Sequence, residues 1–214
     1  MNKMMNRAER GFSLVELLIV VAVVVILSAM AIINVAPARM NSRADAAMDA
    51  VVTQLRLARQ LAIAKRRNVS VNFVAPNQIQ IAILYRTGEP AGNAIQPVYL
   101  NDASSGVRDT SQFMSWSALG TLPTTGFANG DSSGINITQL SGGTSPCAVF
   151  TTTGALVGAA CGGAGLADLA NNNPSNMAVF IGRTSLPATA RAITVMGSTG
   201  RVRTYSWDGV QWRP

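Results

Sequence analysis

The chain has 214 residues, of which 48% are hydrophobic and only 13% charged, and its formal net charge is +7. It contains no histidine, so the usual general base and the commonest metal ligand of proteins are both absent. Its acidic side chains are scattered and form no pair suited to acid/base catalysis. We therefore expect no enzyme, no metal and no cofactor, and the length allows one membrane helix plus one globular domain.

The N-terminal segment combines a basic start, residues 1–11, with an apolar run over residues 17–33 in which only Ser28 is polar. A secretory signal peptide, cut near residues 29–31, fits the basic start. However, the apolar region exceeds the usual length of about 7–15 residues, and Glu16 stands at its entrance. A plain transmembrane anchor also fits, because residues 12–36 at about 1.5 Å per residue can cross a bilayer. This anchor would keep the basic residues 1–11 in the cytoplasm, but it leaves Glu16 unexplained.

Glu16 favours a third interpretation. A carboxylate near the end of a lipid-embedded helix costs on the order of 2–3 kcal/mol, so such a residue marks a functional site. Cleavage after Gly11 would expose a new amine at Phe12. The carboxylate of Glu16 could neutralise that amine on a neighbouring subunit once the helices pack into a filament.

Residues 10–18 read RGFSLVELL and resemble the cleavage and methylation motif of type IV prepilins and type II secretion pseudopilins. The resemblance implies that a membrane-embedded prepilin peptidase cuts between Gly11 and Phe12 and methylates Phe12, and that Glu16 guides assembly. The implied partners are other pilins or pseudopilins, the inner-membrane assembly platform and inner-membrane lipid. The chain would then be a single-pass bacterial inner-membrane protein with a periplasmic head, which enters a filament or its tip on assembly.

Helical character is predicted for residues 12–67, with Pro37 between a membrane-spanning half, 12–36, and an amphipathic half, 37–67. In the second half, apolar residues recur at three- and four-residue steps and predict a stripe that packs on the head: Ala44, Met48, Val51, Leu55, Ala58 and Ala62. The cations of this half are interpreted as a solvated face and as end-of-helix charges: Arg56, Arg59, Lys65, Arg66 and Arg67.

The head, residues 68–214, is predicted to be β-rich. Alternating apolar residues over 69–83 predict a hairpin that turns at 76–77. Further strands are predicted at 97–100, 134–140, 147–152, 177–183, 191–196 and 201–207, with a loop at 162–174. The layout resembles the GspH/FimT family of minor pilins and pseudopilins, including VFTTTG at 149–154 and a closing strand that contains Gly-Arg. It implies an α+β, type IV pilin-like fold, in which a long N-terminal helix packs on an antiparallel β-sheet head.

The two cysteines, Cys147 and Cys161, lie in the predicted head. Outside the cytosol an even count favours one disulfide. The closed loop of about 15 residues would then contribute roughly 3 kcal/mol in the chain-entropy model. The spacing alone is equally compatible with two unpaired thiols.

Positive charge gathers at residues 183–214, which hold five arginines and one acidic residue. Such a basic end could meet nucleic acid, anionic lipid or an acidic protein. Strand alternation places Arg201, Arg203, Tyr205 and Trp207 on one face. The dipeptide at 208–209, Asp-Gly, predicts a two-residue turn that brings residues 211–213 back alongside.

Cations interleaved with aromatics suit nucleic acid, since guanidinium groups pair with phosphates and rings stack on bases. Residues 200–203, GRVR, also resemble the Gly-Arg-x-Arg motif of FimT-like minor pilins that bind DNA during natural transformation. The alternative is an edge strand whose arginines discourage edge-to-edge pairing while the aromatics cover the sheet. Two functions stay open: a structural minor pilin or pseudopilin of a type IV pilus or type II secretion system, and a DNA-binding minor pilin.

Overall fold

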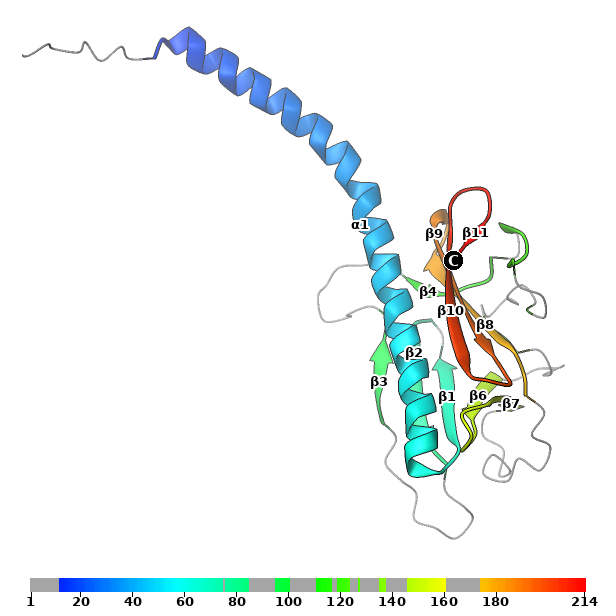
Figure 1. The fold of residues 1–214 in the computed structure, drawn as a ribbon. Helices are drawn as coiled ribbons and strands as arrows, with labels where there is room; N and C mark the ends of the chain where they lie inside the picture. Colours follow the sequence, from blue (N-terminus) through cyan, green and yellow to red (C-terminus); the bar gives the residue numbers. More distant parts are fainter. Residues whose placement is uncertain are drawn as a thin grey trace, which may run out of the picture. The chain divides into compact units, whose positions relative to one another are not determined.

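The computed structural model describes residues 12–74, 76–84, 95–100, 111–116, 119–123, 127, 135–137, 146–160 and 174–214 (Figure 1). Contacts along the chain divide it into two compact units, Met1–Met40 and Asn41–Pro214. Helix α1 (Leu14–Lys65) contributes residues to both units, and its helical assignment is continuous through Pro37.

The first unit contains the apolar part of α1. Its large apolar side chains between Leu14 and Met30 are 49–78% exposed. Among the described residues, all the buried side chains belong to the second unit, which therefore has a hydrophobic core of its own. In the described part of the chain, no helical stretch combines the length and the apolar character of a membrane span.

In the second unit, α1 carries a buried stripe. Its most deeply buried residues are at most 1% exposed: Ala44, Ala47, Val51, Leu55, Ala58 and Ala62. Their three- and four-residue spacing is that of one helix face, which confirms the predicted stripe, with Met48 only partly buried. The helix ends at Lys65, and Arg66 follows with a left-handed φ of 51°.

Two antiparallel sheets make up the rest of the second unit. The first sheet has the order β3-β2-β1-β6-β7 and the second the order β11-β10-β9-β8-β4, with β5 also paired to β8. The strands of the first sheet are β1 (Val69–Val74), β2 (Gln78–Ile83), β3 (Ile95–Tyr99), β6 (Pro146–Phe150) and β7 (Leu156–Ala160). Those of the second are β4 (Gln112–Phe113), β5 (Ile135–Ile137), β8 (Met177–Arg183), β9 (Leu186–Met196), β10 (Arg201–Trp207) and β11 (Trp212–Arg213).

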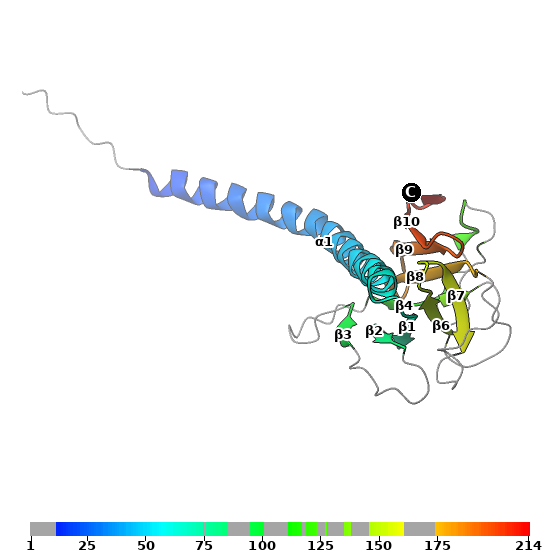
Figure 2. The ribbon, with the colours of Figure 1, turned by 60° about the horizontal axis from the view of Figure 1, so that its bottom comes forward.

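The second half of α1 lies between the sheets, with β1 to β3 on one side and β8 to β10 on the other (Figure 2). The main core joins all three parts, for example Leu55 of the helix, Phe73 of the first sheet and Ile193 of the second. Leu156 also links the sheets directly. Its N–H donates to the carbonyl of Gly197 at 2.7 Å, and its carbonyl accepts from the N–H of Ser175 at 2.9 Å. The predicted α+β class, a helix packed on antiparallel sheets, is confirmed.

The strand predictions agree best where alternation is strong. The first hairpin is confirmed by the pairing of β1 with β2, which places Phe73 opposite Ile79. Strand β9 begins five residues before its predicted start at residue 191, and β7 was not predicted as a strand. Of the predicted strand at 134–140, only 135–137 is described, and the predicted loop at 162–174 lies outside the described residues except for its last residue.

Candidate functional site

Side chains alternate strictly along β10, the strand that carries the predicted site. Val202 packs against the main core beneath the strand, whereas Tyr205 belongs to a second apolar cluster on the opposite face of the sheet. In the antiparallel register, Arg203 lies opposite Thr194 and Tyr205 opposite Ala192 of β9. Arg201, Arg203, Tyr205 and Trp207 therefore project to the face that points away from the main core.

Arg201 and Arg203 are exposed. Among the described residues, neither guanidinium group takes part in a hydrogen bond or an ion pair. On the strand side of β10 that faces away from β9, the short strand β11 pairs only with Ser206 and Trp207. Within the described part of the chain, both arginines thus lie on a strand edge that no further strand pairs with, where either an anionic ligand or water can reach them.

The aromatic residues of the strand are placed differently. Tyr205 is only 3% exposed and belongs to the second apolar cluster, which also contains Phe180, Trp212, Trp116 and Leu122. The expectation that Tyr205 offers its ring to nucleic-acid bases is therefore not met.

Trp207 is partly buried, with its ring edge-on to that of Trp212 at a centroid distance of 5.4 Å. Tyr205 and Trp207 therefore cover the outer face of the second sheet. This leaves the arginines as the exposed part of the predicted site.

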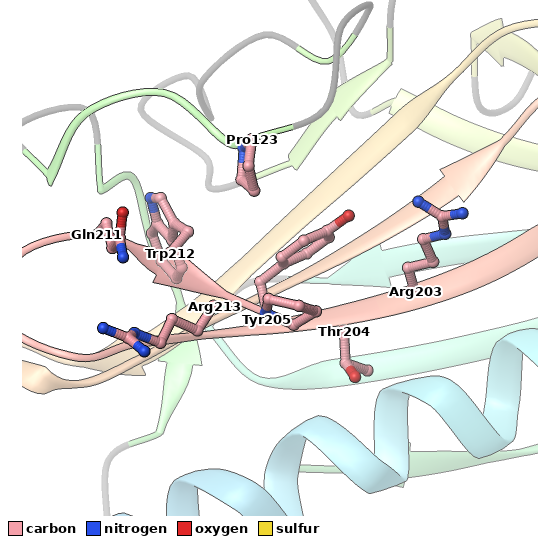
Figure 3. Close-up of a pocket in the computed structure, with 8 residues that line it drawn as sticks. Pro123, Arg203, Thr204, Tyr205, Gln211, Trp212 and Arg213 are labelled. Atoms are coloured by element: carbon pink, nitrogen blue, oxygen red, sulfur yellow. The ribbon is translucent and has the colours of Figure 1, made fainter.

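Beside Arg203 the surface forms a depression of about 890 Å³. It is lined by Pro123, Arg203, Thr204, Tyr205, Gln211, Trp212, Arg213 and Pro214. In Figure 3, Arg203 and Tyr205 lie on one side of β10 and Thr204 points to the other, toward α1. The indole N–H of Trp212 is buried and has no hydrogen-bond partner among the described residues. The sequence did not indicate this depression, because Pro123 contributes to it from a segment distant in the chain.

The turn between β10 and β11 is organised by Asp208. Its Oδ1 accepts the backbone N–H groups of Val210 and Gln211, each at 2.8 Å, and its Oδ2 accepts Nε of Arg213. The backbone bond from Gln211, then that from Val210, then the Arg213 side chain lower the pKa of Asp208 to about 2. The chain returns beside β10 as predicted, through the pairing of Trp207 with Trp212 and of Ser206 with Arg213. The predicted two-residue turn at 208–209 is wrong, because the connection spans residues 208–211 and Gln211 is part of it.

The remaining predicted residues lie elsewhere in the chain. Gly11 is outside the described residues, Phe12 is 81% exposed, and Glu16 lies in the first turn of α1. Cys147 belongs to β6, opposite Ala159 of β7, and Cys161 is outside the described residues. The disulfide therefore remains a prediction.

Comparison with known proteins adds evidence for the N-terminal segment. Residues 6–32 match a family model described as the prokaryotic N-terminal methylation motif. No curated protein matches the chain. A crystal structure of the type IV minor pilin FimU from Pseudomonas aeruginosa, at 13% identity and a TM-score of 0.42, covers 82% of this chain and 92% of its own. A second FimU crystal form gives 13% identity and a TM-score of 0.40, with coverages of 75% and 90%. The motif match supports a type IV pilin-like chain.

Proposed function

We propose that this chain is a minor pilin or pseudopilin subunit of a type IV pilus or type II secretion system. Prepilin peptidase cuts it between Gly11 and Phe12 and methylates Phe12. Residues 12–36 hold the subunit in the inner membrane with its head in the periplasm, and Glu16 guides its assembly with other pilins on the inner-membrane platform.

The observation that carries this proposal is the methylation motif at residues 6–32, whose helical part, from Leu14 to Met30, exposes its large apolar side chains. A contiguous apolar surface of this kind needs lipid or neighbouring helices to cover it. The second unit does not need that surface for folding, because it has its own core. The anchoring and polymerising part is thus separable from the head, as a filament subunit requires.

The processing step is tested by expressing the full chain with and without a prepilin peptidase and determining the N-terminus by mass spectrometry. The expected product begins at a methylated Phe12, and Gly11→Val should block its formation. A product cut near residues 29–31 would instead identify an ordinary signal peptide.

The assembly step is tested with Glu16→Ala. This variant should be processed normally yet fail to enter filaments, because the Phe12 amine of a neighbouring subunit would lose its partner. Ser13→Ala, a substitution in the same segment that removes no charge, is the matched control. Normal incorporation of the Glu16 variant would contradict the assigned role.

A second candidate function is DNA binding for natural transformation. It is favoured by one observation: Arg201 and Arg203 are exposed, and among the described residues their guanidinium groups have no ion-pair partner and their strand edge no pairing strand. Because Tyr205 is buried, these arginines would bind the phosphate backbone with little reading of the bases. Cations of this kind give affinity that falls steeply with salt.

This function is tested by anisotropy titration of residues 39–214 with duplex DNA at several salt concentrations. The Arg201→Ala, Arg203→Ala variant should bind more weakly, and its slope of log affinity against log salt should be shallower by roughly 1.8, or about 0.9 per phosphate contact.

Arg56→Ala, Lys65→Ala removes the same charge from exposed positions of α1 and is the control. An equal loss in this control would indicate a general charge effect. If the unmodified head binds no DNA at low salt, the DNA-binding function is rejected and only the assembly function remains.

A further inference from the structure

Two hairpin turns from different sheets meet beside helix α1. The β6–β7 turn contains Gly154, with φ at +83°, and the β9–β10 turn contains Gly200, with φ at +62°. The N–H of Gly154 donates to the carbonyl of Thr151 at 2.8 Å, and that of Gly200 donates to the carbonyl of Met196 at 2.7 Å. Both positions lie in the left-handed region, which glycine adopts without steric cost.

The packing between the turns leaves no room for a side chain at Gly200. A Cβ there would lie 2.2 Å from the carbonyl oxygen of Gly154 and 2.7 Å from Nε of Arg59. Arg59 itself donates from Nε to the carbonyl of Gly154 at 3.3 Å. A Cβ at Gly154 would in turn lie 3.0 Å from the side chain of Ile63, one helical turn after Arg59. The helix, the first sheet and the second sheet thus touch at one point.

This contact lies directly before the arginines of β10, since Gly200 immediately precedes Arg201. We propose that Arg59, Gly154 and Gly200 form a clasp that fixes the β9–β10 turn on helix α1, and that Arg59 is thereby a positioning residue for Arg201 and Arg203. The positioning half of this proposal rests on the DNA-binding function proposed above. The glycine of the Gly-Arg-x-Arg segment is then required by packing and not by contact with a ligand.

The packing requirement is tested on the full chain in detergent micelles by comparing Gly200→Ala with Gly209→Ala. Gly209 also has a positive φ, +101°, but a Cβ there would meet nothing within 4 Å. The backbone cost is not smaller at Gly209, because its φ lies further from the left-handed minimum at about +57°, whereas only Gly200→Ala must push the Gly154 carbonyl away. We expect Gly200→Ala to unfold at a clearly lower temperature than Gly209→Ala. Equal midpoints would overturn the clasp.

The part played by Arg59 is tested with Arg59→Met, which keeps an unbranched apolar stem and removes the Nε donor. Hydrogen exchange at the amides of Gly154 and Gly200 should become roughly fivefold faster, the effect of losing one ordinary hydrogen bond. The amide of Met114, bonded to the carbonyl of Phe180 at 3.1 Å, is the internal control and should not change. Unchanged exchange at both glycines would overturn the clasp.

Positioning is separated from direct contact by DNA titration of the same protein. Arg59→Met should lower the affinity and leave the salt slope unchanged, whereas Arg203→Ala should make the slope shallower by about 0.9. A shallower slope for Arg59→Met would mean that Arg59 contacts phosphate itself, which overturns positioning. If the unmodified chain binds no DNA, the DNA-binding function fails and positioning fails with it, while the exchange experiment still decides the clasp.

Discussion

The buried guanidinium of Arg191 makes a sharp prediction about how α1 is attached to the second sheet. Arg191 of β9 is 5% exposed, and its Nε donates to Oδ1 of Asp45 on the helix at 2.6 Å. Its Nη1 also donates to the carbonyls of Ala188 and Ala190, at 3.1 and 2.9 Å. The side chain of Asp45 is 52% exposed, so water can solvate it without Arg191. Loss of Asp45 should therefore cost more than the loss of an exposed ion pair, because the buried Arg191 needs this partner whereas Asp45 can be solvated by water instead.

Asp45→Ala removes a charge-assisted hydrogen bond and leaves the guanidinium buried with carbonyl partners only. We expect the free energy of unfolding to fall by about 1.5–3 kcal/mol, the usual effect for a hydrogen bond to a charged group. Asp49→Ala removes an exposed acidic side chain one helical turn later and should change it by less than about 0.5 kcal/mol. In an Arg191→Met background the buried charge is gone, so Asp45→Ala should then cost no more than Asp49→Ala.

The assay is urea unfolding of residues 39–214 at neutral pH, followed by circular dichroism, for the four proteins of the double-mutant cycle and the Asp49 control. A coupling energy equal to the full cost of Asp45→Ala is expected. The reasoning is refuted if Asp45→Ala and Asp49→Ala cost the same. It is also refuted if Asp45→Ala is equally costly with and without Arg191, since Asp45 would then stabilise the helix by another route.

Three further predictions concern the head. NMR titration should give Asp208 a pKa of about 2, and Arg213→Ala should raise it. Because the folded pKa lies below the ordinary value of 3.8, the ionised carboxylate stabilises the turn above pH 3.8, and this stabilisation is lost as the pH falls through about 2. Cys147 and Cys161 should resist alkylation until the protein is reduced, and reduction should lower the free energy of unfolding by about 3 kcal/mol. Alkylation of the unreduced protein would exclude the disulfide. Gly182→Ala should lower the free energy of unfolding by about 1–3 kcal/mol, since the new Cβ would lie 2.5 Å from the Trp116 ring. An unchanged urea midpoint would contradict this contact.

The elements with a strong sequence period could be predicted. The stripe around Leu55 follows from helical spacing, and the β1–β2 hairpin follows from alternation on either side of a turn. The face that Arg201 and Arg203 share also follows, because alternation along a strand is a property of the backbone. Strand β7 is different. Its sequence, LVGAA, contains glycine and alanine where β-branched residues would signal a strand, so only its pairing with β6 identifies it.

The surroundings of the candidate site could not be predicted, because they depend on contacts between distant segments. Tyr205 is buried in a cluster that also contains Trp116 and Leu122, which come from a part of the chain with little periodicity. The Asp45–Arg191 pair joins residues 146 positions apart. Local sequence could indicate that Tyr205 lies beside arginines on a strand, but not that another segment covers its ring.

The Asp45–Arg191 pair attaches helix α1 to the second sheet near the start of its second half, and the proposed clasp of Arg59, Gly154 and Gly200 attaches it at a second point near its end. Two points separated along a helix restrain rotation of the sheet about either one, which a single contact does not. Arg201 follows the second point directly, so its backbone position is defined relative to α1 and not only relative to β9. In the proposed filament subunit α1 also packs against its neighbours, and the arginine strand would then take a fixed place on the filament surface.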